Sequence, residues 1–254
     1  MKYTPPRKRN LYEPGAEKPF KVSRSKIENF ANCKRCFYMD RRLGVGQPPS
    51  LPFTLNSAVD RLLKSEFDGY RSKGEKHPIM VEQGVDAVPV SHPELDDWRN
   101  NFKGVQFHNE DLNMIFFGAI DDLWQTSSGE YVVVDYKSTA KKDDITVLDQ
   151  PWHETFKRQM DIYQWLLRKN GYKVSDTGYI LYCNGNAYVE RFDSRIDFRM
   201  TLLPYEGDTS WVDDITVSLY ECLNSDELPE TESFCDYCKY VGAVGKTLGT
   251  EFIL

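Results

Sequence analysis

The 254-residue sequence lacks any apolar run close to the roughly 20 residues that a membrane-spanning helix requires. Its first ten residues are polar, basic and proline-containing, so we expect no signal peptide and a cytoplasmic location. Internal repeats and low-complexity tracts are also missing. The hydrophobic fraction of 40% and the mean hydropathy of −0.57 are ordinary for a soluble chain with one sizeable core.

The sequence has no excess of basic residues. It contains 32 Lys and Arg against 39 Asp and Glu, which gives a formal net charge of −7 and a pI near 5.3. This balance argues against indiscriminate nucleic-acid binding, which usually needs a basic surface. Short basic clusters occur nevertheless, and each is either a local phosphate contact or simply a solvated face: residues 7–9, 34–35 with 41–42, 141–142 and 157–158.

Histidine is scarce, but cysteine is not. None of the four histidines has a metal-ligand partner at clear spacing, so we expect surface residues: His77, His92, His108 and His153. Four of the six cysteines form two pairs with C-x-x-C spacing, Cys33 with Cys36 and Cys235 with Cys238. In a reducing compartment such pairs favour a metal over disulfides. The remaining two, Cys183 and Cys222, are expected to be buried small hydrophobes.

One segment predicts a β-hairpin that gathers charge. Residues 118–121 and 132–137 flank a turn at 127–129, where Gly129 can adopt positive φ. If Ser128 is the centre, Asp121 lies opposite Asp135, and directly opposed residues have Cβ atoms about 4.5–5.5 Å apart. Lys137 projects from the same face as Asp135. Two close carboxylates repel each other unless a cation lies between them, so the pattern favours a divalent metal beside a phosphate.

The hydrophobic pattern predicts the other elements. Residues 155–170 form an amphipathic helix on which Gln159 and Tyr163, four positions apart, share one face. Further helices are expected at 23–43, 56–70, 93–101 and 208–223, and strands at 104–108, 113–125, 131–138 and 199–205. Residues 178–183 and 187–192 are expected to pair as a hairpin around 184–186. This order predicts a mixed α/β sandwich around a central sheet.

These motifs together resemble the PD-(D/E)XK nuclease superfamily, in which an acid, a hairpin turn and acid-x-Lys follow in that order. Gln159 to Tyr163 resembles the Q-x-x-x-Y motif of the RecB-like branch, which includes CRISPR-adaptation-type nucleases. Residues 23–38 are similar to the opening of these nucleases, and residues 234–238 to their C-terminal cysteine group. The resemblance implies a restriction-endonuclease-like α/β fold, with a central mixed sheet flanked by helices and a cysteine clasp joining the N- and C-terminal segments.

The resemblance also implies roles for individual residues. Asp121, Asp135 and Lys137 would be catalytic, and the two aspartates would hold Mg²⁺ or Mn²⁺. Gln159 and Tyr163 would contact DNA or order the active site. Many relatives have a histidine ligand in the preceding helix, where this sequence offers Asp60 instead; an all-oxygen site favours hard cations.

The four paired cysteines resemble the ligands of iron–sulfur members of the branch. Those members commonly place one cysteine at the start and three at the end, whereas this sequence divides them two and two: Cys33, Cys36, Cys235 and Cys238. The spacing suits a 4Fe–4S cluster or tetrahedral zinc. The resemblance favours the cluster, because zinc sites usually draw both pairs from nearby sequence.

The sequence therefore predicts a flexible arm at 1–20 and one nuclease-like domain at 21–254, with a helical part (21–103), a catalytic core (104–205) and a C-terminal clasp (206–254). The predicted activity is metal-dependent DNA hydrolysis, with an exonuclease acting on single strands or ends as the expected form. Two alternatives stay open: a catalytically silent nucleic-acid-binding module, and an accessory subunit of a helicase or integrase complex.

Overall fold

The computed structural model describes residues 6–48 and 53–249, which form two compact units. The cysteine unit draws on residues 1–51, 108–116 and 210–254, and the sheet unit on residues 52–107 and 117–209. The domain boundaries predicted at residues 20, 103 and 205 stay predictions. Within the described residues, no helix combines the length and the apolar character that crossing a bilayer requires.

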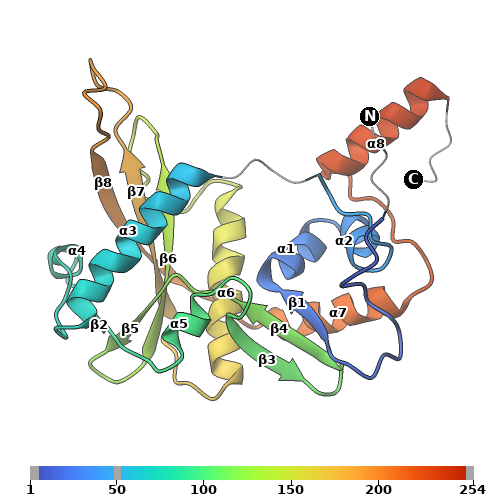
Figure 1. Ribbon diagram of the computed structural model, residues 1–254, viewed down its shortest axis with the longest axis horizontal. Coiled ribbons are helices and arrows are strands. Elements are labelled where there is room, and N and C mark those ends of the chain that lie inside the picture. Colours follow the sequence, from blue (N-terminus) through green and yellow to red (C-terminus); the bar gives the residue numbers. More distant parts are fainter. Residues whose placement is uncertain (1–5, 49–52, 250–254) are drawn as a thin grey trace. The chain divides into compact units, whose positions relative to one another are not determined.

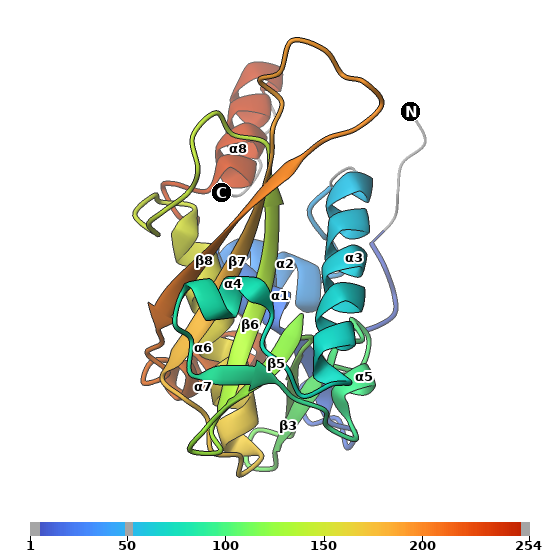
Figure 2. The same cartoon turned by 90° about the vertical axis from the view of Figure 1, so that its left-hand side faces the viewer.

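The sheet unit is built on five strands in the order β2-β5-β6-β7-β8. β6 and β7 run parallel, and the other neighbours are antiparallel. Two helices, α3 (Thr54–Arg71) and α6 (His153–Lys169), lie on opposite faces of this sheet (Figures 1 and 2). The predicted mixed sheet flanked by helices is confirmed. The strands are β2 (Ala87–Pro89), β5 (Asp122–Thr126), β6 (Tyr131–Thr139), β7 (Thr177–Gly185) and β8 (Phe198–Glu206), with short helices α4 (Pro78–Glu82) and α5 (Leu95–Trp98) on either side of β2 in the chain.

The central strand β6 separates the core of the sheet unit from its polar side. Its even-numbered side chains, Val132, Val134 and Tyr136, are buried in one cluster with three apolar residues of α3: Val59, Leu63 and Phe67. Successive side chains of a strand point to opposite faces. Asp135 and Lys137 therefore face the α6 side of the sheet, away from the α3 core.

Residues 113–125 do not form the single strand that their pattern predicts. They divide into β4 (Met114–Gly118) and β5, and the N–H of Ile120 donates to the carbonyl of Trp98 at 3.1 Å, outside any ladder. Gly104 marks the same bend: its φ is +64°, and a Cβ there would lie 2.5 Å from the carbonyl oxygen of Gly118. β4 belongs to a second sheet of order β1-β4-β3, with β1 at Phe20–Ser23 and β3 at Val105–Asn109; the boundary between the units falls within β3 and β4.

The predicted hairpin at 178–192 is wrong in its second strand. β7 continues through Gly185 and pairs with β8, in the register Gly185 to Phe198. Residues 186–197 form the intervening loop, in which Asp193 and Ser194 both adopt positive φ. The sequence prediction placed the turn at Asn184-Gly185-Asn186, but these backbone groups remain in or beside the ladder, since the N–H of Asn186 donates to the carbonyl of Asp197.

The cysteine unit contains four helices among its described residues. The predicted helix at 23–43 is two helices, α1 (Arg24–Asn32) and α2 (Lys34–Arg41), because Cys33 between them is extended, with φ −165° and ψ 107°. The helix predicted at 208–223 is α7 (Val212–Asn224). The fourth, α8 (Asp236–Leu248), was not predicted; it begins directly after Cys235.

A buried aspartate holds the cysteine unit together electrostatically. The side chain of Asp40 is 5% exposed and forms ion pairs of 2.8 Å with Arg7, Lys26 and Arg41. Burial by itself would raise the pKa of Asp40, but the hydrogen bonds and charges of Arg41 and Lys26 lower it to about 2. The ionised carboxylate is therefore the form that the fold stabilises.

We expect Asp40→Asn to lower the free energy of unfolding by about 2 kcal/mol at pH 7, because three cations lose their common counter-ion. The folded pKa lies below the unfolded value of about 3.9, so this contribution is present above that value and is lost as the pH falls toward 2. Denaturant unfolding followed from pH 7 to pH 2 measures it. The control is Asp226→Asn, which removes an exposed carboxylate that pairs with Arg42 at 3.5 Å. If Asp40→Asn lowers the free energy of unfolding by the same amount from pH 7 down to pH 2, the lowered pKa of Asp40 is contradicted.

Candidate active site and cysteine cluster

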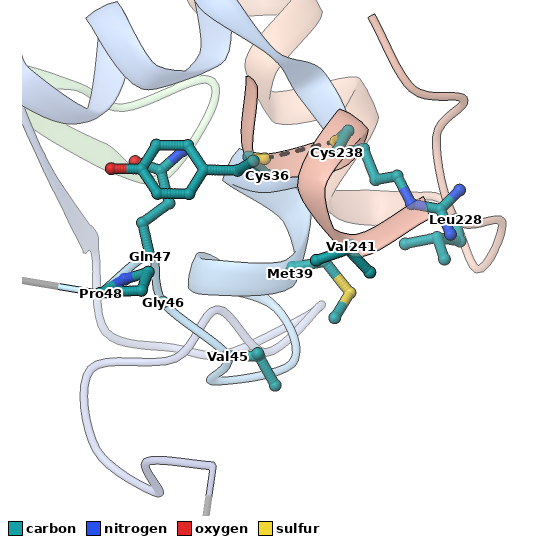
Figure 3. A pocket seen from close by; sticks show the side chains of 11 residues that line it. Cys36, Met39, Val45, Gly46, Gln47, Pro48, Leu228, Cys238 and Val241 are labelled. Atoms are coloured by element: carbon teal, nitrogen blue, oxygen red, sulfur yellow. Dashed lines mark hydrogen bonds between the residues drawn. The ribbon is translucent and has the colours of Figure 1, made fainter. Parts of the chain in front are cut away.

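The four paired cysteines meet in the cysteine unit. The Sγ atoms of Cys33, Cys36, Cys235 and Cys238 all lie within 4.8 Å of one another. Cys36 is 3.5 Å from Cys235 and 3.6 Å from Cys238, and Cys33 is 3.8 Å from Cys238. Figure 3 shows Cys36 and Cys238 facing each other from α2 and α8. The predicted clasp between N- and C-terminal segments is confirmed as a cluster.

Each C-x-x-C pair spans the start of a helix. Cys33 is the N-cap of α2 and accepts a hydrogen bond from the N–H of Cys36, while Cys235 is the N-cap of α8. The unpaired N–H groups and the dipole of a helix N-terminus stabilise a thiolate. This position explains why Cys33 leaves the helix: its extended backbone turns the sulfur toward its partners.

The thiols perturb one another strongly. Burial and the neighbouring Cys235 raise the pKa of Cys36 to about 12, and burial with Cys235 and Cys36 raises the pKa of Cys238 further. Burial would also raise the pKa of Cys33, but backbone hydrogen bonds from Cys36 and Glu232 lower it overall. Four thiolates therefore cannot ionise together without a cation among them. The donor set fits a thiophilic metal.

The sulfur spacing has the dimensions of a single tetrahedral ion. Bonds of about 2.3 Å at tetrahedral angles place ligand sulfurs about 3.8 Å apart. Three of the Sγ–Sγ separations, of 3.5 to 3.8 Å, agree with that geometry. An apolar cavity of about 300 Å³ adjoins the cluster (Figure 3), lined in part by Met39, Val45, Leu228 and Val241.

In the sheet unit, the hairpin register agrees with the prediction. Asp122 pairs with Val134 and Leu123 with Val133, a register that centres the hairpin on Ser128. Asp121 lies one residue before the first paired residue, and its Oδ2 accepts the N–H of Tyr136 at 2.9 Å. Asp121 is therefore held beside the Asp135–Lys137 segment by a backbone contact that the sequence pattern did not predict.

Asp135, Lys137, Gln159 and Tyr163 form one hydrogen-bonded network. The Nε2 of Gln159 donates to Asp135 Oδ1 at 2.7 Å and to the Tyr163 hydroxyl at 2.9 Å. Lys137 pairs with Asp135, and its Nζ also donates to Gln159 Oε1 at 3.3 Å. Asp135 is 1% exposed, so its charge depends on these partners. The structure thus brings together the four residues that the sequence singled out on β6 and α6.

The other predicted ligand, Asp60, is linked to Asp121 by a lysine that the sequence analysis missed. Lys64, one helical turn further along α3, lies 2.9 Å from Asp60 and 3.2 Å from Asp121. Burial would lower the pKa of Lys64, but Asp121 and Asp60 raise it overall, so the ammonium is charged. A signal existed: Lys64 is at i+4 from Asp60 and therefore on the same helix face.

The two aspartates of the Asp121-Asp122 pair serve different faces. Asp122 is fully buried and faces the core, as the alternation of the strand predicts. It pairs with Arg71 and Arg99 and accepts bonds from the indole N–H of Trp124 and the hydroxyl of Tyr136. Arg71 and Arg99 also pair with Asp68, so Asp122 belongs to a structural ion-pair network. Its neighbour Asp121 remains on the side of the candidate site.

Two of the histidines differ from the prediction of surface positions. His77 is 2% exposed; it caps α4 through Nδ1 and contacts Glu66 at 3.0 Å through Nε2. His153 is 1% exposed at the start of α6. Both rings pack against aromatic neighbours, Phe67 and Tyr70 around His77 and Trp152 around His153. Their burial follows from tertiary contacts that no local spacing reveals.

A family model described as the PD-(D/E)XK nuclease superfamily matches residues 21–243. The chain belongs to this superfamily. A solved structure titled "Crystal structure of SSO0001" is similar to the chain at 13% identity, with a TM-score of 0.34, covering 84% of this chain and 80% of that one. No curated protein matches the chain.

PD-(D/E)XK nucleases use divalent metals, and the oxygen donors of this site are of the kind that hard cations bind. In the structure two ammonium groups neutralise the carboxylates, Lys64 at Asp121 and Lys137 at Asp135. Among the described residues, the cysteines are the one group of three or more potential ligands that lie within 4.8 Å of one another. The role of Asp60 as a third ligand stays a prediction.

We expect Lys64→Met to lower the melting temperature in chelator by a few degrees, because Asp60 and Asp121 lose their shared cation, worth about 1 kcal/mol at this partly exposed position. Mg²⁺ should then stabilise the variant more than the wild type, since the ion no longer competes with the ammonium. Thermal melts with and without Mg²⁺ measure the difference. Lys103→Met, which removes an exposed pair with Asp97, is the control. Equal Mg²⁺ shifts in all three proteins would refute the competition.

Proposed function

We propose that this chain is a metal-dependent deoxyribonuclease of the RecB-like branch, acting as an exonuclease on single strands or ends. The observation that supports it best is the network of Gln159 with Asp135, Lys137 and Tyr163. An ordinary surface hairpin has no need to bury an aspartate beneath a lysine and a helix glutamine. The network makes Q-x-x-x-Y and D-x-K parts of one site, as the RecB-like resemblance implies.

Each side chain has a distinct task in this proposal. Asp121 and Asp135 hold Mg²⁺ or Mn²⁺, with Asp60 as a further oxygen ligand. A bound divalent ion would lower the pKa of its water and neutralise charge on the phosphate. Lys137 places a positive charge where the phosphate gains charge and orients the attacking water. Gln159 fixes the rotamer of Asp135, and Tyr163 fixes Gln159 in turn.

The acidic character of the chain bears on its substrate and its partners. With a net charge of −7, tight binding to duplex DNA through phosphates alone is not expected. Ends and single strands offer bases as well as phosphates, so they suit such a surface better. The same charge is compatible with a helicase- or integrase-type partner that supplies DNA affinity. All six cysteines are free thiols, as is typical of a reducing compartment, and we propose the cytoplasm.

We expect the purified protein to degrade labelled single-stranded DNA with Mg²⁺ or Mn²⁺ and not with EDTA. Asp135→Asn and Lys137→Met should each lower the rate by about 10²-fold or more, because the first removes a carboxylate that holds the metal and the second removes a positive charge beside the reacting phosphate. Asp96→Asn, which changes an exposed acid on α5, is the matched control and should retain activity.

Two other outcomes would contradict the proposal. Binding of DNA by folded protein, without cleavage under either metal, would establish the silent binding module. Cleavage only after a helicase or integrase partner is added would establish the accessory subunit.

For the cysteine cluster we propose one tetrahedral Zn²⁺. The Sγ separations of 3.5 to 3.8 Å support it, because in a 4Fe–4S cluster each cysteine binds a different iron and the sulfurs stand farther apart. The iron–sulfur cluster that the resemblance favours is therefore the less suitable occupant. Its role is structural, since the metal would join α2 to α8 within the cysteine unit.

We expect about one zinc per chain and no visible colour in protein purified without oxygen, measured by elemental analysis and absorbance. Cys238→Ser should lose the metal and lower the stability of the cysteine unit, because metal binding is coupled to folding. Cys222→Ser, a cysteine outside the cluster, is the control and should keep it. A brown protein with stoichiometric iron and sulfide would overturn the zinc assignment and leave the nuclease proposal intact.

A further inference from the structure

A second cavity lies in the sheet unit, next to the candidate active site. The segment between β6 and α6 encloses about 420 Å³ together with Tyr188 of the β7–β8 loop. This volume is in the range of small-ligand sites. None of the residues in the network of Asp135 and Gln159 lines this cavity, so the cavity is a separate feature of the sheet unit.

The wall of the cavity is fixed by a buried amide. Asn184 on β7 is 2% exposed; its Oδ1 accepts the N–H of Lys141 at 2.8 Å, and its Nδ2 donates to the carbonyl of Lys141 at 3.1 Å and to Asp144 Oδ1 at 2.9 Å. Arg199 on β8 also binds Asp144, at 2.8 Å. The connecting segment is therefore held in place by two strands of the sheet.

One buried group lining this cavity has an unused hydrogen-bonding atom. His153 accepts the N–H of Gln150 through Nδ1 at 3.1 Å, so in the neutral ring the proton is on Nε2. Among the described residues Nε2 has no hydrogen-bond partner, although the ring is 99% buried. Burial lowers the pKa of His153, which favours the neutral form. The Nε2 atom is itself closed off from water, so His153 shapes the wall of the cavity and offers no hydrogen bond to a ligand in it.

The same cavity presents two aromatic faces. Trp152 is 51% exposed and Tyr188 is 65% exposed, and both line the cavity. The ammonium of Lys141 lies 5.6 Å from the centre of the Trp152 ring. Exposed aromatic faces next to cations are how proteins hold the bases and the backbone of single-stranded nucleic acid.

The charges of the lining indicate which part of a nucleotide would enter. Lys141 and Lys142 are offset by the carboxylates of Asp143 and Asp149, and Asp144 is paired with Arg199. A phosphate would meet as many acids as bases inside the cavity. A neutral heteroaromatic ring would not be repelled, and it can stack on the aromatic faces.

The cavity is also at a suitable distance from the hairpin. Lys141 follows Lys137 by four residues, a span of about 13 Å at the rise of an extended strand, or a few nucleotides. Phe156 lies between the two sites: its ring is 4.7 Å from the Lys137 ammonium, and its centre is 6.0 Å from that of His153.

We propose that this cavity binds an unpaired nucleobase of the DNA strand that enters the active site, stacked on Trp152 and Tyr188. The proposal rests on the nuclease function above and deepens it. A base within a duplex is already stacked and paired, so the cavity selects single strands and frayed ends.

The test is the affinity of the full-length protein for a fluorescein-labelled 12-nucleotide oligothymidylate, followed by anisotropy in EDTA so that no cleavage occurs. We expect Trp152→Ala/Tyr188→Ala to raise the Kd about 10-fold or more, since stacking contributes strongly to each bound base. Both side chains are exposed, so the fold should tolerate the change. Phe102→Ala removes an aromatic ring that is 88% exposed elsewhere in the sheet unit, and it should leave the Kd within about twofold.

Two further ligands identify what the cavity holds. An abasic 12-mer and a blunt duplex should each bind the wild type more weakly than the oligothymidylate does. For both ligands, the Kd should be the same for the wild type and the double variant. The proposal is overturned if the wild type does not bind the oligothymidylate, if the double variant binds it as the wild type does, or if the variant loses equal affinity for the abasic strand.

Failure of this proposal is distinguishable from failure of the nuclease function. Metal-dependent cleavage by a protein whose binding ignores Trp152 and Tyr188 would exclude the nucleobase site alone. Binding that depends on these rings, without cleavage under Mg²⁺ or Mn²⁺, would exclude the nuclease alone.

Discussion

The alternation of side chains along β6 is the constraint on which the sheet unit depends. Val132, Val134 and Tyr136 are committed to the core under α3, and this burial fixes which residues reach the other face. Asp135 and Lys137 therefore face α6, where both contact Gln159, which in turn donates to the hydroxyl of Tyr163. A slip of one residue would place a carboxylate and an ammonium in the apolar core under α3. Hydrophobic burial therefore sets the geometry of the polar site.

Both candidate metal sites are concentrations of like charge that the fold must offset. In the sheet unit the carboxylates are balanced by ammonium groups, Lys64 at Asp121 and Lys137 at Asp135. In the cysteine unit, Cys33 and Cys235 lie at the N-termini of α2 and α8. The pKa of Cys33 is lowered, whereas the pKa values of Cys36 and Cys238 are raised. A hard cation suits the first arrangement and a thiophilic one the second. Under the proposed function, the first site would hold a catalytic ion and the second a structural one.

The sequence predicted what depends on local periodicity and failed where tertiary contacts decide. The hairpin register follows from alternation and turn chemistry, and it is confirmed. The break at Cys33 was missed because the sulfur must turn toward residues some 200 positions away, which no helical pattern encodes. Lys64 was missed because its partner Asp121 comes from another element. The burial of His153 likewise depends on packing beyond its own helix.

The most direct test of the account is a crystal structure of the protein soaked in Mn²⁺, with an anomalous difference map calculated at the manganese edge. We expect a peak bounded by the carboxylates of Asp121 and Asp135, with Lys64 withdrawn from Asp121. A map with no peak there at millimolar Mn²⁺, and both lysines still paired with their aspartates, would contradict the claim that β6 carries a metal-dependent catalytic centre.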